Sequence, residues 1–238
     1  MQKPTSQELF SAVDATWSAK QFISHDGWML REGAGGGKRV SAATLEAPID
    51  DVDIIVAEQQ MTALGQKSLF MVRDSDAALD NVLEQADYGI VDPVVVLASP
   101  VSDLLKQKYT SHSVNLAESP SNDAKTIWND GGISPDRLSI MERVTAPKTI
   151  LESSDMGVAF VAAHKGIAMV HAVEVSKDHR RKGVANALMY KAALWAKDHN
   201  CNWLAVLTVR ENVPACTLYQ TLGMTEAAAY HYRFKRSV

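Results

Sequence analysis

A predicted strand enters a helix through a basic turn that contains glycine, and this feature constrains the chain more than any other. The segment HRRKGVANALM, residues 179–189, places Arg180, Arg181 and Lys182 directly before Gly183, and apolar residues at helical spacing follow. Cations at a helix N-terminus are unfavourable, because that end already carries the positive pole of the macrodipole. The first turn also has N–H groups without a partner in the helix. The segment therefore predicts an anion site, and a diphosphate ligand would explain the cations.

Glycine at position 183 would let such a ligand approach the backbone closely. The alternative is a solvated basic turn, since arginine and glycine alone are weak evidence for a phosphate site. The other phosphate motifs fail: GAGGGKR, residues 33–39, lacks P-loop spacing and has Arg39 where a Mg²⁺-binding hydroxyl is needed, so it is interpreted as a hairpin turn. No GxGxxG fingerprint follows a predicted strand, and the histidines show no metal-binding spacing, so no metal site is expected.

Composition limits the class of partner. The chain has 24 basic and 28 acidic residues, a formal net charge of −4. This balance argues against a duplex nucleic acid partner and fits a small molecule or a peptide. Cys201 and Cys216 form no CxxC pair and are interpreted as reduced thiols. The N-terminus has no signal-like apolar run, and no stretch reaches the length of a membrane span, so we expect a cytoplasmic protein without a membrane partner.

The hydrophobic pattern predicts alternating helices and strands in two halves. Residues 1–105 predict the order α-β-β-α-β-α-β, with a strand, glycine turn and strand over 27–45. Residues 106–238 predict β-α-α-β-β-β-α-β-α-β, in which the turn at 164–166 makes a hairpin. A polar segment, residues 107–123, places the boundary between two domains at 105/106.

Two segments resemble the signatures of the GNAT acyltransferase superfamily. In HRRKGVANALM, Arg180, Gly183 and Ala185 occupy the three defining positions of R/Q-x-x-G-x-G/A, the loop that binds the acetyl-CoA pyrophosphate. ENVPACTLYQTLGM, residues 211–224, resembles N-x-x-A-x-x-L-Y-x-x-x-G-F, with Met224 in place of the usual phenylalanine. The positions that match this second signature are Asn212, Ala215, Leu218, Tyr219 and Gly223.

The resemblance covers about residues 110–238 and implies the GNAT fold, an α/β fold with a mixed, mostly antiparallel central sheet flanked by helices. Residues 1–105 resemble the smaller, degenerate GNAT-like α/β module that precedes the catalytic domain in two-domain bacterial members. No R/Q-x-x-G-x-G/A loop follows a strand there. One cofactor site is therefore expected, in the domain 106–238.

The resemblance implies acetyl-CoA as co-substrate, with no metal. Backbone N–H groups from Arg181 to Asn186 would bind the phosphates, and the strand before them would pair with the pantetheine arm. Asn212 would either bond the pantetheine or cap its helix. The expected cofactor-binding residues are Val173, Val175, Arg180, Arg181, Lys182, Gly183, Val184, Ala185, Asn186, Asn212, Ala215 and Tyr219.

The family's mechanism is direct attack of an amine on the thioester, which needs an acid for the thiolate and a base for the amine. Tyr219 matches the family's general-acid position, with a packed helix tyrosine as the alternative. His171 and Glu174 are the candidate bases, and a structural histidine is the alternative for His171. Simple alternation would make His171 face the same way as Val173 and Val175, unless a bulge intervenes.

The expected acceptor is the primary amine of a small molecule or of a peptide N-terminus. Trp128 and Trp28 are candidates for the walls of its pocket, with core burial as the alternative. Two other functions stay open: a non-catalytic acyl-CoA sensor, and an interaction protein that acts through its first domain. Family members often form dimers, so the resemblance also allows a homodimer. The sequence identifies no interface for it.

Overall fold

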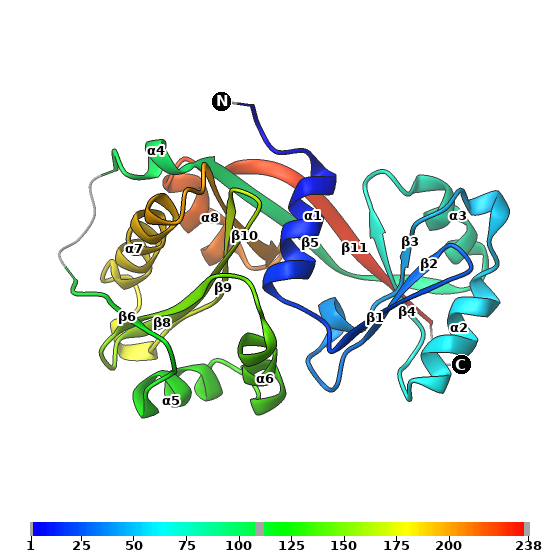
Figure 1. Ribbon diagram of the computed structural model, residues 1–238, viewed down its shortest axis with the longest axis horizontal. Helices are drawn as coiled ribbons and strands as arrows, with labels where there is room; N and C mark the ends of the chain where they lie inside the picture. The colour runs from blue at the N-terminus through cyan, green and yellow to red at the C-terminus, as the bar shows by residue number, and fades with distance from the viewer. Residues whose placement is uncertain (1, 108–111, 236–238) are drawn as a thin grey trace.

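The computed structural model describes residues 2–107 and 112–235, which form two sheets with helices packed on them (Figure 1). One sheet has three strands in the order β1-β2-β3. The other has eight, in the order β4-β11-β5-β10-β9-β8-β7-β6. All neighbouring strands of the large sheet pair antiparallel except β10 and β9. The predicted fold class is confirmed: a mixed, mostly antiparallel sheet flanked by helices, preceded by a small sheet.

The small sheet begins with a hairpin that the sequence pattern did not predict. Strands β1 (Gln21–His25) and β2 (Trp28–Glu32) join through Asp26 and Gly27, which have φ angles of 45° and 78°. An Asp-Gly pair with two positive φ angles suits a tight hairpin turn. The predicted pairing across the glycine turn is confirmed, since β2 pairs antiparallel with β3 (Thr44–Leu45). The nearby helical elements are η1 (Lys38–Val40), η2 (Ile49–Asp51), α2 (Ile54–Ala63) and α3 (Ala77–Gln85).

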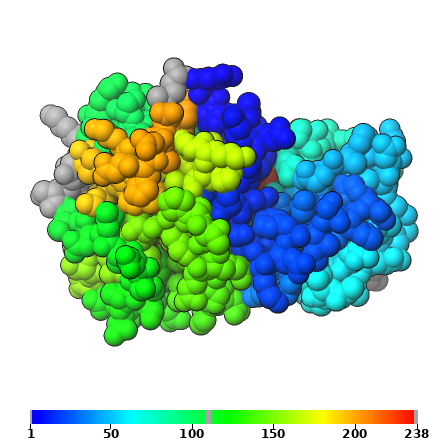
Figure 2. Space-filling model, in the orientation of Figure 1, coloured from blue at the N-terminus to red at the C-terminus, as the bar shows by residue number. Residues whose placement is uncertain are grey.

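Helix α1 (Ser6–Thr16) lies across the middle of the molecule and packs against β8, β9 and β11. It starts with a capping box in which Thr5 accepts from the Glu8 backbone N–H and the Glu8 carboxylate accepts from the Thr5 backbone N–H. In the space-filling view, the dark blue N-terminal residues lie between the green-to-orange half and the light blue half (Figure 2). This helix therefore forms part of the packing between the two sheets.

The second half contains the predicted elements in the predicted order. They are β6 (Asn115–Ala117), α5 (Asn122–Asp130), α6 (Pro135–Arg143), β7 (Lys148–Ser153), β8 (Gly157–His164), β9 (Ile167–Val175), η3 (Lys177–His179), α7 (Val184–Asp198), β10 (Trp203–Val209), α8 (Val213–Thr221) and β11 (Thr225–Lys235). Helices α7 and α8 pack on one face of the sheet. Helix α1 packs on the other face, and so do α5 and α6.

Two strands of the first half complete the large sheet. β4 (Leu69–Arg73) forms its edge beside β11, and β5 (Tyr88–Pro100) lies between β11 and β10. The short helix α4 (Val101–Leu104) follows β5. The large sheet thus contains strands from both sides of residue 105, and the division into two domains at that point stays a prediction. Residues 108–111 of the polar segment lie outside the described residues.

Candidate active site

Strands β9 and β10 separate partway along their length. They pair in parallel from Ile167↔Trp203 to Val170↔Val206, and no pair between these strands follows. Beyond Val206, β10 continues along β5, while β9 continues along β8. The two strands therefore leave an opening at their carboxyl ends, and the turn that leads from β9 into α7 begins there. Strand ends of this kind expose backbone groups that a neighbouring strand does not use.

A β-bulge lies on β9 at this opening. His171 pairs with Phe160, but Glu174 pairs with Val158, so two residues of β9 oppose the single residue between Phe160 and Val158. Ala172 has a φ of 50°, in the left-handed region. The indole Nε1–H of Trp128, on α5, donates to the Ala172 carbonyl over 2.8 Å. This hydrogen bond satisfies a carbonyl at the bulge, and it gives the fully buried Trp128 a structural role.

The bulge reverses the alternation of side chains along β9. His171 lies in the aromatic group of Trp17 and Phe160, on the face covered by α1 and α6, whereas Val173 and Val175 pack against the core beneath α7. Simple alternation would make His171 face the same way as the two valines, but the bulge is the exception to that expectation, because the extra residue shifts the period by one.

The backbone of Val173 and Val175 is directed toward the opening. The N–H of Ser176 donates to the Met156 carbonyl on the β8 side, over 2.9 Å. Because successive residues of a strand direct their polar groups to opposite sides, the neighbouring Val175, and Val173 two residues before it, point away from β8. The Val175 carbonyl accepts a 3.2 Å hydrogen bond from Arg180 Nε. The backbone of both valines is thus oriented as the predicted site for the pantetheine arm needs.

The first turn of α7 has the features of an anion site. Gly183 is the N-cap residue in a left-handed conformation, with φ of 87°, and no hydrogen bond from a side chain of the described residues caps the helix. The N–H of Ala187 donates to the Gly183 carbonyl, which leaves the N–H groups of residues 184–186 ahead of the first helical bond. The side chains of Arg180, Arg181 and Lys182 are exposed around this turn.

Helix α8 carries the candidate acid, Tyr219, and begins at the N-cap residue Asn212. The Asn212 side chain accepts from the Ala215 N–H over 3.2 Å, so of the two readings of Asn212 the structure shows the helix cap. Tyr219 is buried, with 5 % of its surface exposed. Burial raises the pKa of the Tyr219 phenol, and the negative charge of Glu174 raises it further. The phenol therefore stays protonated at neutral pH and lies within electrostatic range of Glu174.

Glu174 lies on the opposite face of the sheet from α7, beside the end of α5. A Cβ added to Gly131 would lie 2.5 Å from the Glu174 Cδ, so the carboxylate packs directly on that glycine. Burial raises the pKa of the Glu174 carboxyl, and the positive charge of Arg180 opposes the shift. A pocket of about 340 Å³ opens here. Its charged lining residues are Asp123, Asp130, Asp155, Glu174, Asp178, Lys177 and Arg180.

His171 is buried, with 3 % of its surface exposed, and each of its ring nitrogens has a neighbour. Nε2 lies 2.9 Å from Thr16 Oγ1, which itself donates to the Ala12 carbonyl. The hydroxyl proton is thus in use, and the ring N–H donates to Thr16. Nδ1 faces Arg39 Nη1 at 3.5 Å. Burial, together with the charge of Arg39, lowers the pKa of His171 well below its usual value, so the ring is neutral.

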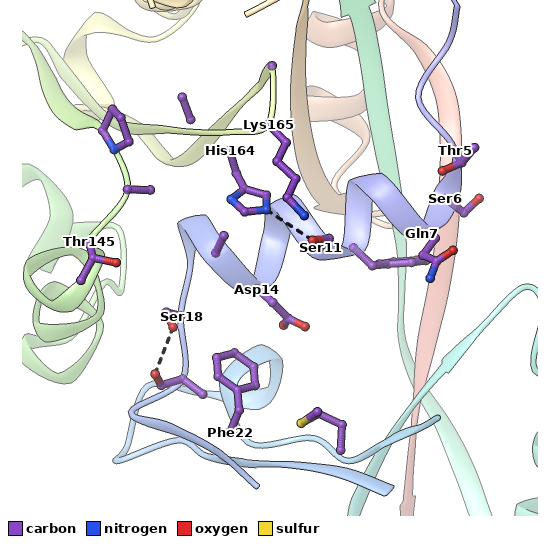
Figure 3. A pocket seen from close by; sticks show the side chains of 18 of the residues that line it. Thr5, Ser6, Gln7, Ser11, Asp14, Ser18, Phe22, Thr145, His164 and Lys165 are labelled. Atoms are coloured by element: carbon purple, nitrogen blue, oxygen red, sulfur yellow. Dashed lines mark hydrogen bonds between the residues drawn. The ribbon is translucent and has the colours of Figure 1, made fainter. Parts of the chain in front are cut away.

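A large groove elsewhere in the molecule contains none of the predicted site residues. It has a volume of about 1340 Å³ and runs beside α1, past the turn between β8 and β9. In Figure 3, Ser11 and Asp14 of α1 point into it, and Ser11 approaches His164. This turn is at the opposite end of β9 from Val175, so the groove is separate from the opening between β9 and β10.

Sequence reasoning missed Arg39 and Thr16, which contact His171, because their segments are distant from it in the chain. Trp28 is buried and donates to the Asp53 carbonyl, so it is a core residue. Within residues 2–107 and 112–235, no cluster of His, Cys, Asp or Glu is placed to hold a metal ion. No helix in the same ranges is both long and apolar enough to cross a membrane.

Comparisons with known proteins agree with this geometry. Residues 153–224, from the end of β7 to the start of β11, match the model of the Acetyltransferase (GNAT) family. The chain is 24 % identical over 237 residues to the uncharacterized N-acetyltransferase YobR of Bacillus subtilis (strain 168), covering 93 % of this chain and 95 % of that protein.

Two further proteins share part of the sequence or the whole fold. Aminoglycoside N(6')-acetyltransferase type 1 of Acinetobacter haemolyticus is 27 % identical over 125 residues, covering 46 % of this chain and 85 % of that protein. The structure of a GCN5-related N-acetyltransferase from Kribbella flavida superimposes with a TM-score of 0.70 at 17 % identity, over 97 % of this chain and 95 % of that one. Residues 153–224 thus match the Acetyltransferase (GNAT) family, and the chain has the fold of a GCN5-related N-acetyltransferase.

Proposed function

We propose that the chain is an N-acetyltransferase that transfers the acetyl group of acetyl-CoA to the primary amine of a small molecule or peptide. The observation that carries this proposal is the opening between β9 and β10 beside the uncapped first turn of α7. A helix end suited to an anion and strand backbone groups that point away from β8 occur side by side there. A long ligand with phosphates at one end and amides along its arm needs both.

The residues present fit acetyl-CoA in two respects. The first-turn N–H groups of α7 and the cations Arg180, Arg181 and Lys182 suit the pyrophosphate. The backbone groups of Val173 and Val175 suit the amides of the pantetheine arm. When bound, the coenzyme supplies the activated acetyl group as a thioester.

Glu174 is the residue that we assign as general base. Glu174 directly follows Val173 in β9. Burial raises the pKa of its carboxyl group, which brings that pKa closer to neutral pH. Four aspartates line the pocket beside it, and this negative charge suits an incoming ammonium group. Glu174 would take the proton from the amine, directly or through water.

Tyr219 is the residue that we assign as general acid. Its raised pKa keeps the phenol protonated, which allows it to donate to the sulfur as the thiolate leaves. Helix α8 brings Tyr219 to the α7 face, whereas Glu174 lies on the other face. In this proposal the acid and the base therefore act from opposite sides of the opening, Tyr219 at the sulfur and Glu174 at the amine.

His171 has a different role in this proposal. The ring is buried, neutral and engaged at both nitrogens, so it has no free lone pair for the amine proton. We infer that His171 fixes the position of the bulge rather than acting as a base.

An acetyl-transfer assay tests the proposal. The protein is incubated with acetyl-CoA and a panel of amines, comprising amino acids, polyamines, aminoglycosides and short peptides. Aminoglycosides are included because one relative is named aminoglycoside N(6')-acetyltransferase. We expect release of the CoA thiol in a 1:1 ratio with an acetylated amine found by mass spectrometry. Acetyl-CoA binding without transfer to any amine would instead support the second function, an acyl-CoA sensor.

A further inference from the structure

We propose that the acceptor carries a carboxylate close to its reacting amine, and that Arg39 binds this carboxylate at the inner end of the opening between β9 and β10. The inference rests on the proposed transferase function and narrows the acceptor to amino-acid-like zwitterions. Arg39 comes from η1, in the first half of the chain, so the N-terminal region would supply a specificity residue to the site.

Arg39 is a partly buried cation that forms no ion pair with the residues that the structure describes. Its Nε is inaccessible to solvent and has no hydrogen-bond partner among those residues. Its Nη1 approaches His171 Nδ1, and its Cζ lies 5.9 Å from the centre of the Trp17 ring. A buried charge is costly unless a partner compensates it. An anionic ligand would supply that partner.

The groups around the guanidinium add further donors. The hydroxyls of Tyr230 and Tyr232 lie 3.3 Å apart, and both interact with Arg39. Burial raises the pKa of Tyr232 well above its usual value, so its hydroxyl remains a neutral donor. One hydroxyl proton can bond the other oxygen, which leaves the second proton available. The cluster of Arg39, His171, Tyr230 and Tyr232 thus combines a positive charge with surplus donors.

This cluster adjoins the opening between β9 and β10, where acetyl transfer is proposed. Val170 is the last residue of β9 that pairs with β10, and His171 follows it directly. Glu174 lies on the same face of β9, three residues further on. At about 3.3 Å per residue, these two side chains start within about 10 Å of each other. A cation at one end and a carboxylate at the other complement a zwitterion, with its carboxylate at Arg39 and its amine at Glu174.

The glycine-rich segment that precedes Arg39 suits entry of a ligand. The side chains of His171, Tyr230 and Tyr232 are buried, and in this proposal a ligand reaches them as residues 33–37 shift. Four of these five residues are glycines, which gives the backbone wide conformational freedom. The segment rests against α6, where a Cβ on Gly35 would meet the Asp136 carboxylate.

Paired acceptors test the proposal on the wild-type protein. The transfer assay is run with the L-amino acids and with their carboxamides, in which the amine is kept and the carboxylate becomes neutral. At least one acid should have a kcat/KM about 30-fold or more above that of its amide. Equal rates for acid and amide would overturn the inference, while the proposed transferase function would stand.

Variants of Arg39 assign the effect to that residue. In Arg39→Gln the acid-to-amide ratio should fall to near one, mainly through KM of the acid, and Arg39→Lys should retain part of the ratio. Arg137→Gln is the matched control, because Arg137 lies beside Gly37 of the same segment but outside the cluster. An unchanged ratio in Arg39→Gln would overturn the inference. If Arg39→Gln does not fold, the acid-to-amide ratios of Arg39→Lys and of the wild-type protein test the inference instead.

Calorimetric titration of the same pairs gives a readout that needs no turnover. Binding of an L-amino acid but not of its amide, lost in Arg39→Gln, would support the carboxylate site even in a protein that transfers no acetyl group. The proposed function would then fail while the inference survives. Equal affinity for acid and amide, or no binding of either, would overturn the inference.

Discussion

His171 and Glu174 are three residues apart on β9, yet their side chains face the same side of the sheet. An unbroken strand would place them on opposite faces, since its side chains alternate with a period of two. The bulge at Ala172 changes this, and the Trp128 indole bonds the carbonyl of the bulge residue. The arrangement of Glu174, the strand backbone and the cluster around Arg39 therefore depends on a single extra residue.

Trp128→Phe tests the role of the bulge. The change leaves the partly buried Ala172 carbonyl without its donor, so the free energy of unfolding should fall by about 1–3 kcal/mol. Glu174 would lose its fixed position, and kcat/KM should fall by roughly 10-fold to 10²-fold. Trp28→Phe is the matched control, since Trp28 is equally buried and its indole donates to the Asp53 carbonyl over 3.1 Å. Trp28→Phe should show a similar fall in the free energy of unfolding and keep the wild-type kcat/KM. Denaturant unfolding and steady-state rates measure both, and equal kinetic losses in the two variants would contradict a specific role for the bulge.

Tyr219→Phe tests the proton donor. The change keeps the buried aromatic ring and removes only the hydroxyl, so folding and acetyl-CoA binding should be preserved. The kcat should fall by about 10²-fold or more, as expected for loss of a general acid. Calorimetry gives the affinity and single-turnover kinetics gives the rate. A variant that retains the wild-type rate would remove Tyr219 from the mechanism.

Glu174→Gln tests the base through pH. A base acts only when deprotonated, so wild-type activity should be lost as pH falls through the Glu174 pKa, which burial raises above 4.5. The variant should lose about 10²-fold to 10⁴-fold in kcat. Its remaining activity should also lack the acidic limb of the pH–rate profile. If that limb persists unchanged in Glu174→Gln, another group is the base.

His171 should appear in the pH dependence of stability and not in that of catalysis. Its pKa in the folded protein lies well below 6.5, so at lower pH the unfolded chain binds a proton that the native ring does not. Stability is therefore fully present above pH 6.5 and is lost as pH falls below it, with a slope of up to about 1.4 kcal/mol per pH unit. Denaturant unfolding between pH 5 and pH 7.5 should show this slope in wild type and a smaller one in His171→Gln. A titration of His171 near pH 6.5 by NMR would contradict a buried neutral ring.

Local patterns in the sequence predicted most of the fold. The helical spacing after Gly183 predicted α7, and the turn at 164–166 predicted the β8–β9 hairpin, because each depends on residues close together in the chain. The hairpin between β1 and β2 was missed, although Asp26-Gly27 is a turn signal. The place of β5 between β10 and β11 depends on pairings over more than a hundred residues, which no local pattern contains.

The candidate site was predictable where it depends on backbone and motif. Asn212, Gly183 and Tyr219 lie in segments whose residue types are set by a cap, a left-handed turn and a helix face. The orientation of His171 was not predictable, since Ala172 is not a residue type that marks a bulge. Arg39 was missed because its contacts with His171 and the C-terminal tyrosines are made by tertiary packing alone.

Calorimetric titration of acetyl-CoA tests the central claim, that the turn into α7 binds the cofactor, most directly. It compares wild type with Gly183→Asp, which places a charge and a side chain at the anion site. Gly65→Asp is the control, because Gly65 also has a positive φ, of 69°, and has no atom within 4 Å of an added Cβ. We predict a Kd on the order of micromolar for wild type and for Gly65→Asp, and no binding to Gly183→Asp. Equal binding to all three proteins, or none to the folded wild type, would contradict the claim.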